Sequence, residues 1–183
     1  MKKIKLITTI FIAMLLIAAC GSKTDEDTGS AADVSFDDIY ASTEEAMVDI
    51  LKDESGLSKE ELLANYFIED LAASADNPNV EILLERMELD TDNMANGKVI
   101  MPMMNVNSDE LILLEAKTKE DVESLKASLE LELAAQTQVW EQYLPDQYEK
   151  VKNNVIKTNG NFLLYVTSLD QDQIVEAFDK HFK

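Results

Sequence analysis

The chain has 183 residues, with 36 acidic against 16 basic side chains and a formal net charge of −20 at pH 7. Such a charge excludes nucleic acid as a partner, because nucleic acid is bound through Lys and Arg contacts to phosphate. One cysteine and one histidine exclude an internal disulfide, the usual zinc sites and a Ser-His-Asp arrangement with a choice of bases.

Residues 1–19 have the pattern of a secretory signal peptide. Three lysines among the first five residues precede an uncharged run that ends at Ala19. The run is short for a membrane span, which needs about 20 apolar residues. The segment Ile17-Ala18-Ala19-Cys20 resembles the lipobox of bacterial lipoproteins, in which cleavage between Ala19 and Cys20 leaves a cysteine that receives a diacylglyceryl group. An incidental cysteine in an ordinary signal peptide is the alternative.

The domain organisation follows from this signal. We expect a mature chain that begins at Cys20 and is held at the outer face of the cytoplasmic membrane, since two acyl chains give lasting attachment. Residues 20–35 are small and polar, which predicts a flexible tether. Residues 36–183 have the length of one α+β domain, with an acidic helical part over 36–97 and a hairpin-helix part over 98–183.

The acidic part carries seventeen Asp and Glu against three Lys and Arg. Ser35 begins a predicted helix that ends at Gly56. Ser58 and Glu61 form a second capping box, followed by apolar residues at helical spacing as far as Leu71. Asn77-Pro78 begins a third, short helix. This part is therefore predicted to be helical throughout.

The second part changes period at residue 98. The segment 98–116 reads as a β-hairpin, with Pro102 placing its first strand at a sheet edge or a bulge. A long amphipathic helix begins near Thr118 and Asp121 and stops before Pro145. Two further strands are joined by Asn159-Gly160, which predicts a type I′ turn, and a last helix contains Ile174, Val175, Phe178 and Phe182.

The order of elements predicts the fold class. A helical N-terminal segment is followed by strand-strand-helix twice, and whether this is an internal duplication stays open. Each hairpin must cover one apolar side, so we expect an α+β fold with an antiparallel sheet of two β-hairpins and helices packed on one face.

Few residues offer chemistry, and none is predicted to be catalytic. His181 lies near the C-terminus, where a cation at a helix end is the simpler interpretation. Residues 90–97 begin like a calcium loop but lack the later ligands. Met101, Met103 and Met104 are thioethers that suit copper(I), although strand alternation sends Met104 to the opposite face. We therefore predict no metal and no cofactor.

Four residues are candidates for lining a ligand site: Met101, Met103, Trp140 and Tyr143. Apolar residues of this kind in a strand and a helix more often pack a core. If they instead line an open groove, the protein is expected to bind a small ligand.

Several segments carry a family resemblance: "VIMPMMNVNSDELILLEAK", "YLPDQYEKVKNNVIKTNGNFLLYVTS" and "IVEAFDK". Over residues 83–183 the chain resembles a family of bacterial lipoproteins, typical of Gram-positive clostridia, that carry domain of unknown function 4358. The resemblance implies a lipid-anchored protein outside the membrane and supplies no activity or catalytic residue. The chain departs from the family over residues 53–81, which look like an added stretch, and around Arg86 and Met87, where a Tyr-Gly is usual.

Three functions are compatible with these observations. The first is a non-enzymatic binding or accessory module at the cell envelope, with a membrane lipid and an envelope protein as partners. The alternative is a small-ligand or cation-binding lipoprotein associated with a transporter, which requires a partly apolar pocket between the sheet and the helices. The third is a hydrolase, which requires two carboxylates converging in a cleft, one of them with a raised pKa.

Overall fold

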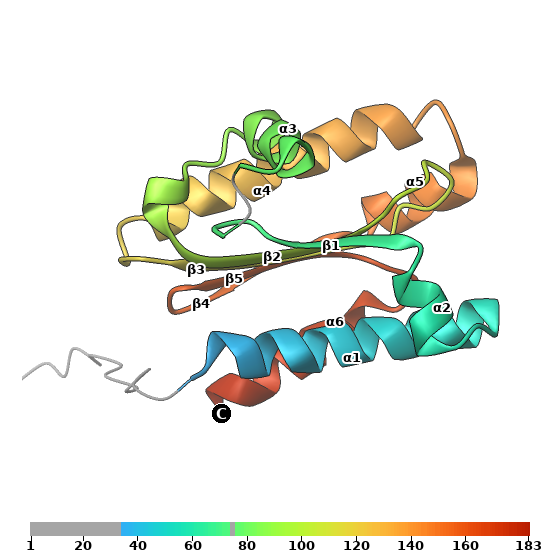
Figure 1. Ribbon diagram of the computed structural model, residues 1–183, viewed down its shortest axis with the longest axis horizontal. Coiled ribbons are helices and arrows are strands. Elements are labelled where there is room, and N and C mark those ends of the chain that lie inside the picture. The colour runs from blue at the N-terminus through green and yellow to red at the C-terminus, as the bar shows by residue number, and fades with distance from the viewer. Residues whose placement is uncertain (1–33, 74–75) are drawn as a thin grey trace, which may run out of the picture. The chain divides into compact units, whose positions relative to one another are not determined.

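The computed structural model describes residues 34–73 and 76–183 (Figure 1). The predicted signal peptide, its cleavage point at Ala19, the lipidation site Cys20 and nearly all of the tether lie outside the described residues. Within the described ranges, no helix combines the length and the apolar character needed to cross a membrane.

The first helix forms as its sequence predicts. Helix α1 covers Phe36–Ser55; the Ser35 side chain accepts a hydrogen bond from the Asp38 amide, and Gly56 ends the helix with φ +70°. Glycine is favoured there because a left-handed backbone costs a residue with a Cβ about 1 kcal/mol or more. Ser58 and Glu61 then form the predicted capping box of a five-residue helix, α2, over Lys59–Leu63.

The helix predicted to continue to Leu71 is wrong beyond α2. Residues Tyr66–Asp70 form strand β1, which pairs antiparallel with β2, Met94–Pro102. Aromatic and β-branched residues such as Tyr66, Phe67 and Ile68 fit a half-buried strand, and pairing with a neighbouring strand overrides local helical spacing. The acidic part is therefore not helical throughout, because it supplies one whole strand and the start of another.

The remaining elements follow in the predicted order, with one added helix after the long one. They are α3 (Pro78–Met87), the 3₁₀ turn η1 (Thr91–Asn93), β3 (Glu110–Ala116), α4 (Val122–Trp140), α5 (Pro145–Lys152), β4 (Val155–Asn159), β5 (Phe162–Thr167), α6 (Gln171–Asp179) and the 3₁₀ turn η2 (Lys180–Phe182). The α+β class, the antiparallel sheet and the preceding N-terminal helix are confirmed.

The five strands form one antiparallel sheet in the order β1-β2-β3-β5-β4. Strand β2 is thus an interior strand and not an edge. Pro102 is tolerated because the last pair between β2 and β3 is Ile100 with Leu111, so the missing N–H lies beyond the ladder to β3.

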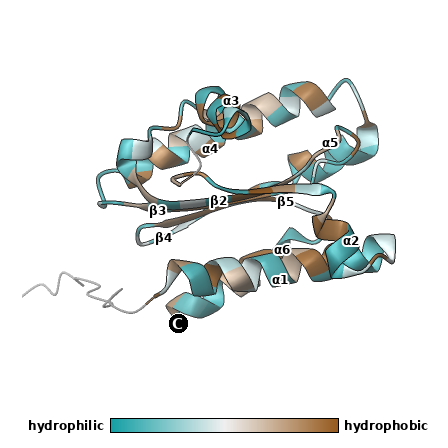
Figure 2. Ribbon diagram, in the orientation of Figure 1, coloured by the Kyte–Doolittle hydropathy of each residue, from teal (hydrophilic) through white to brown (hydrophobic). Residues whose placement is uncertain are grey.

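Helices cover both faces of the sheet, whereas a single covered face was predicted (Figure 1). Along β3, Leu111 and Leu113 pack in one core with α1 and α6, and Ile112 and Leu114 pack in a second core with α3 and α4. Strands buried on both faces read as continuous apolar runs, which is why "LILL" shows no alternation. Brown segments on both sides of the sheet in Figure 2 mark the two cores.

The hairpin turn is displaced by one residue from its predicted centre. Asn159 pairs with Phe162, so the two loop residues are Gly160 and Asn161. Gly160 has φ +57°, and Asn161 is not among the described residues with positive φ. A positive φ at the first loop residue alone belongs to a type II′ turn and not to the predicted type I′ turn.

Candidate functional site

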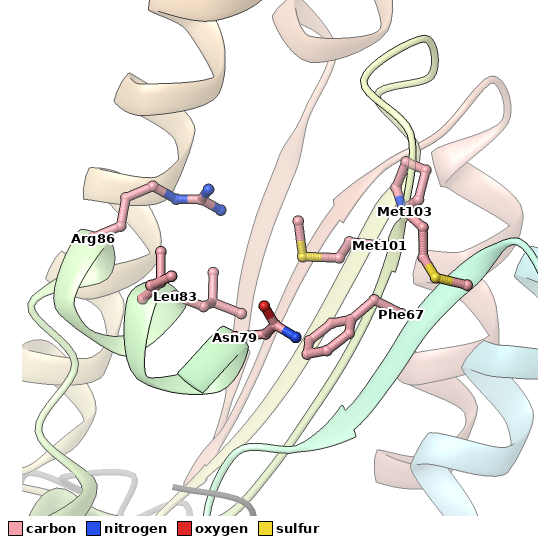
Figure 3. Close-up of a pocket in the computed structure, with 8 residues that line it drawn as sticks. Phe67, Asn79, Leu83, Arg86, Met101 and Met103 are labelled. Atoms are coloured by element: carbon pink, nitrogen blue, oxygen red, sulfur yellow. The ribbon is translucent and has the colours of Figure 1, made fainter. Parts of the chain in front are cut away.

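Two adjoining cavities lie on the face of the sheet covered by α3 and α4. One has a volume of about 360 Å³ and is lined by residues that include Phe67, Asn79 and Leu83 (Figure 3). The other, of about 250 Å³, reaches Glu110 and Trp140. Both are lined by a shared set, Arg86, Met101, Pro102 and Met103, and together they form the feature that we call the α3–α4 cleft.

The loop of residues 103–109 forms one wall of this cleft and is fastened at both ends. The Met103 amide donates to the Asn65 carbonyl oxygen at 3.0 Å. At the other end, the Ser108 amide donates to Gln147 Oε1 at 2.9 Å and the Ser108 hydroxyl bonds the Gln147 carbonyl oxygen at 3.1 Å. The wall is therefore preformed, as small-molecule sites usually are.

A chain of polar side chains crosses from α3 into α4. Arg86 donates to both oxygens of Glu132, with Nε–Oε2 at 2.8 Å and Nη2–Oε1 at 2.6 Å. Gln136 donates to Glu132 Oε1 at 2.6 Å and accepts from Trp140 Nε1 at 2.8 Å. The side chain of Glu132 is fully buried, and spacing by four residues places these three α4 side chains on one helix face.

Burial alone would lower the pKa of Arg86. The charge of Glu132 and its hydrogen bonds to Arg86 outweigh this effect, so the pKa of Arg86 is raised. The arginine therefore stays ionised. Figure 3 shows its guanidinium group extending from α3 toward Met101. Nη1 is not engaged in the pair with Glu132.

Glu110 is the second carboxyl group of this region, at the start of β3. It is 3% exposed and lines the smaller cavity. Its Oε1 has no hydrogen-bond partner among the described residues, and neither has the hydroxyl of Tyr165. Burial raises the pKa of Glu110 well above the usual carboxyl value, and the charge of Glu132 raises it further; the charge of Arg86 and the adjacent hydroxyl of Tyr165, as a hydrogen-bond donor, oppose the change. Burial, followed by the charges of Glu110 and Glu132, likewise raises the pKa of Tyr165.

Three of the four predicted ligand-lining residues come together. Met101, Met103 and Trp140 line the smaller cavity, whereas Tyr143 lies outside it, 53% exposed, with its ring centroid 5.9 Å from that of Trp140. Met104 lines the same cavity. Met104 also lines a cavity beside Leu51 and Leu62 on the opposite side, so it lies between the two faces in the loop that follows the end of β2 at Pro102.

Sequence reasoning missed three polar residues that line the cleft, Arg86, Glu110 and Gln136, and the buried Glu132 that binds two of them. Weak signals were present. Arg86 is the only arginine in the chain, and Glu110 opens an otherwise apolar strand. A charged residue at such a position is unusual, because buried carboxylates are rare unless they are paired.

His181 is not the exposed helix-end cation that the sequence predicts. It is half-buried in η2 against α1, where its Nε2 lies 2.9 Å from the Ser42 hydroxyl oxygen. Burial and the neighbouring Lys180 lower its pKa, against the opposing charge of Asp38. The imidazole is therefore neutral at pH 7.

The calcium-like segment has a local structural role. Asp90 caps η1 by accepting a hydrogen bond from the Asp92 amide at 2.9 Å. Within residues 34–73 and 76–183, no three His, Cys, Asp or Glu side chains are grouped so that they would hold a metal ion.

Comparison with known families places the chain in one of them. The model of the family described as "Domain of unknown function (DUF4358)" matches residues 70–168, which is more than half of the chain. The protein belongs to this family. The match includes β2 to β5, α3 and α4, and therefore every polar residue of the α3–α4 cleft. No curated protein matches, and no solved structure matches.

Proposed function

We propose that this protein is a lipid-anchored, non-enzymatic binding module at the outer face of the cytoplasmic membrane of a Gram-positive bacterium, and that the α3–α4 cleft holds a small ligand. The anchoring rests on the signal-like N-terminus and the lipobox-like segment ending at Cys20. The ligand rests on the structure of the cleft. A module of this kind delivers its ligand to an envelope partner such as a transporter.

The observation that carries the proposal is the unpartnered Oε1 of Glu110, a residue that lines a cavity with both polar and apolar side chains in its wall. Leaving a buried polar group without a partner costs about 1–3 kcal/mol or more. Binding sites combine apolar walls with a few convergent polar groups that fix the ligand's orientation. The sulfur-bearing side chains of Met101 and Met103 suit such walls, because methionine adapts to the shape of what it contacts.

A carboxylate-dependent hydrolase is supported less well. Glu110, with its raised pKa, and Glu132 are two neighbouring carboxyl groups, as that reaction requires. However, Glu132 is fully buried, is held by both Arg86 and Gln136, and does not line either cavity. Both carboxyl groups of such a hydrolase must reach substrate or water, and Glu132 reaches neither.

Methyl NMR of methionine-labelled protein tests the ligand site. On titration with a mixture of small amines, alcohols and acids, the methyl signals of Met101 and Met103 should shift. Met47, buried in the core on the opposite face, is the internal control and should not move. Shifts confined to Met47, or no shifts at all across the mixture, would contradict the ligand-binding function.

Substitution of Cys20 tests the anchor separately. Cys20→Ala should abolish acylation and leave the leader attached, while the matched Ser22→Ala should be processed and membrane-bound. Mass spectrometry of each purified protein reads out both features. An unmodified sulfur in the native protein would overturn the anchoring proposal without touching the cleft.

A further inference from the structure

The polar groups of the α3–α4 cleft and its wall do not balance in charge once Glu110 is ionised. Two carboxyl groups, Glu110 and Glu132, face one guanidinium group. Arg86 directs two of its nitrogens to Glu132, so its charge is already compensated. Glu110 has no cation of its own, so its neutral, protonated form leaves the cluster balanced and its ionised form leaves the cluster short of one positive charge.

The groups around Glu110 come from each element packed against it. Arg86 comes from α3, Glu132 from α4 and Tyr165 from β5, the strand beside β3. Toward the cavity, the neighbouring wall consists of Met101, Met103 and the loop of residues 103–109. Among the described residues, the cation whose charge acts on Glu110 is thus Arg86, which Glu132 already holds.

We propose that the ligand of the cleft carries a primary ammonium group on a short apolar body, and that Glu110 receives the ammonium group. This inference rests on the proposed binding function and specifies its ligand class. A buried ion is stabilised when it gains an opposite charge with good hydrogen bonds. An ammonium group is a compact donor of three hydrogen bonds, and one N–H aimed at Oε1 completes the unpartnered oxygen. The apolar body contacts Met101 and Met103.

The alternatives fit the same groups less well. A carboxylate ligand would meet Arg86 after Glu132 has taken its charge, and would place a third acid beside Glu110. A divalent metal ion requires several oxygen ligands, and the described residues around Glu110 do not supply a group of three. The net charge of −20 additionally raises the local concentration of cations near the protein.

Binding of the ammonium group is coupled to the release of a proton from Glu110. In the free protein Glu110 keeps its proton to a higher pH than an ordinary carboxyl group, because burial and the charge of Glu132 raise its pKa. When the ammonium group binds, the O–H bond of the carboxyl group breaks and the proton leaves to water, so one cation replaces another. Affinity for the ammonium ligand should therefore rise with pH until Glu110 loses its proton in the free protein.

Three probes of the same size and different charge test the inference: n-pentylammonium, 1-pentanol and pentanoate. The three probes have the same chain length, so fit to the cavity of about 250 Å³ does not distinguish them and any difference in affinity reports their charge. By calorimetry on the full chain at pH 8, pentylammonium should bind about tenfold or more tightly than pentanol, as expected for a charge-assisted hydrogen bond. Titrations in two buffers of different ionisation enthalpy, repeated at several pH values, should report proton release on binding that falls to zero as the pH rises through the pKa of Glu110.

Glu110→Gln should remove the preference for pentylammonium over pentanol, while Glu130→Gln, an exposed acid on α4, should preserve it. Equal binding of pentylammonium and pentanol by the native protein would overturn the inference and leave the binding function standing. Preferential binding of pentanoate would overturn it as well and would assign the polar contact to Arg86. Failure of all three probes, together with unmoved Met101 and Met103 signals, would overturn both proposals. The comparison among the three probes uses the native protein alone. It therefore decides the test even if Glu110→Gln folds poorly.

Discussion

Arg86 of α3 and Glu132 of α4 form a two-point ion pair that joins the two helices over the sheet, with donor–acceptor distances of 2.8 and 2.6 Å. Glu132 has no exposed side-chain surface, whereas Arg86 is 35% exposed. The carboxylate is thus the desolvated partner, and it depends on the guanidinium group for its charge balance.

We predict that Arg86→Met destabilises the fold by about 3 kcal/mol, because removal of one partner leaves a buried charge without compensation. Urea denaturation at pH 7 measures this loss. The double variant Arg86→Met/Glu132→Leu should recover much of the loss, since replacement of both partners by apolar groups is often close to neutral. A single variant as stable as the native protein would show that Glu132 is not held as a charged group.

The control for this prediction is Glu130→Gln on the same helix. Glu130 lies 3.8 Å from Lys126 and is 59% exposed. Exposed pairs of this kind contribute about 0–1 kcal/mol, so the control variant should unfold at nearly the native urea concentration.

The raised pKa of Glu110 predicts a pH-dependent stability that Glu110→Gln removes. Above its usual value of 4.5, the folded protein keeps a proton on Glu110 that the unfolded chain has released. The contribution of this group to stability is thus fully present below pH 4.5 and falls as the pH rises toward its folded pKa, by at most about 1.4 kcal/mol per pH unit.

Denaturation of both proteins between pH 5 and 8 measures this difference. Gln keeps the shape of the carboxyl group and cannot ionise, so the stability of Glu110→Gln relative to the native protein should increase with pH. A difference that is constant over this range would mean that Glu110 ionises as it does in the unfolded chain.

The outline of the fold could be predicted from the sequence because its signals are local. Ser35, Gly56 and Pro145 mark helix boundaries through their own backbone chemistry, and each does so in the structure. Strand β1 could not be predicted in this way. Tyr66 and Phe67 are also compatible with helical spacing, and what decides between the two is pairing with β2, about thirty residues further along the chain.

The residues of the site also fall into two groups, those that could be predicted from the sequence and those that could not. Met101 and Met103 could be proposed from residue type, because apolar residues with an unusual density of sulfur stand out in a sequence. Glu110 and Glu132 could not, since they are two of 36 acidic residues and only tertiary packing distinguishes them from solvated ones. The same limit applies to His181, whose contact with Ser42 spans most of the domain.

The hairpin between β4 and β5 gives a prediction that distinguishes the two turn types. Gly160→Ala should destabilise the protein by about 1 kcal/mol, because φ +57° is strained for any residue with a Cβ. A Cβ there would meet nothing within 4 Å, so the loss is conformational and not steric. Asn161→Gly is the control, since a type I′ turn would gain from glycine at this second position and the observed turn should not. Thermal unfolding of both variants separates the two cases.

Gln136 gives the last prediction, because it links the buried carboxylate to the chain's single tryptophan. It donates to Glu132 at 2.6 Å and accepts from Trp140 Nε1 at 2.8 Å. Gln136→Leu removes both bonds and leaves the buried indole N–H without an acceptor, at a cost of about 1–3 kcal/mol. The fluorescence maximum of Trp140 should shift to shorter wavelength with the loss of its polar partner. Gln138→Leu, an exposed change on the same helix, should alter neither stability nor emission. Unchanged emission in Gln136→Leu would mean that Trp140 does not depend on this chain of hydrogen bonds, and the polar wall of the α3–α4 cleft would then end at Glu132.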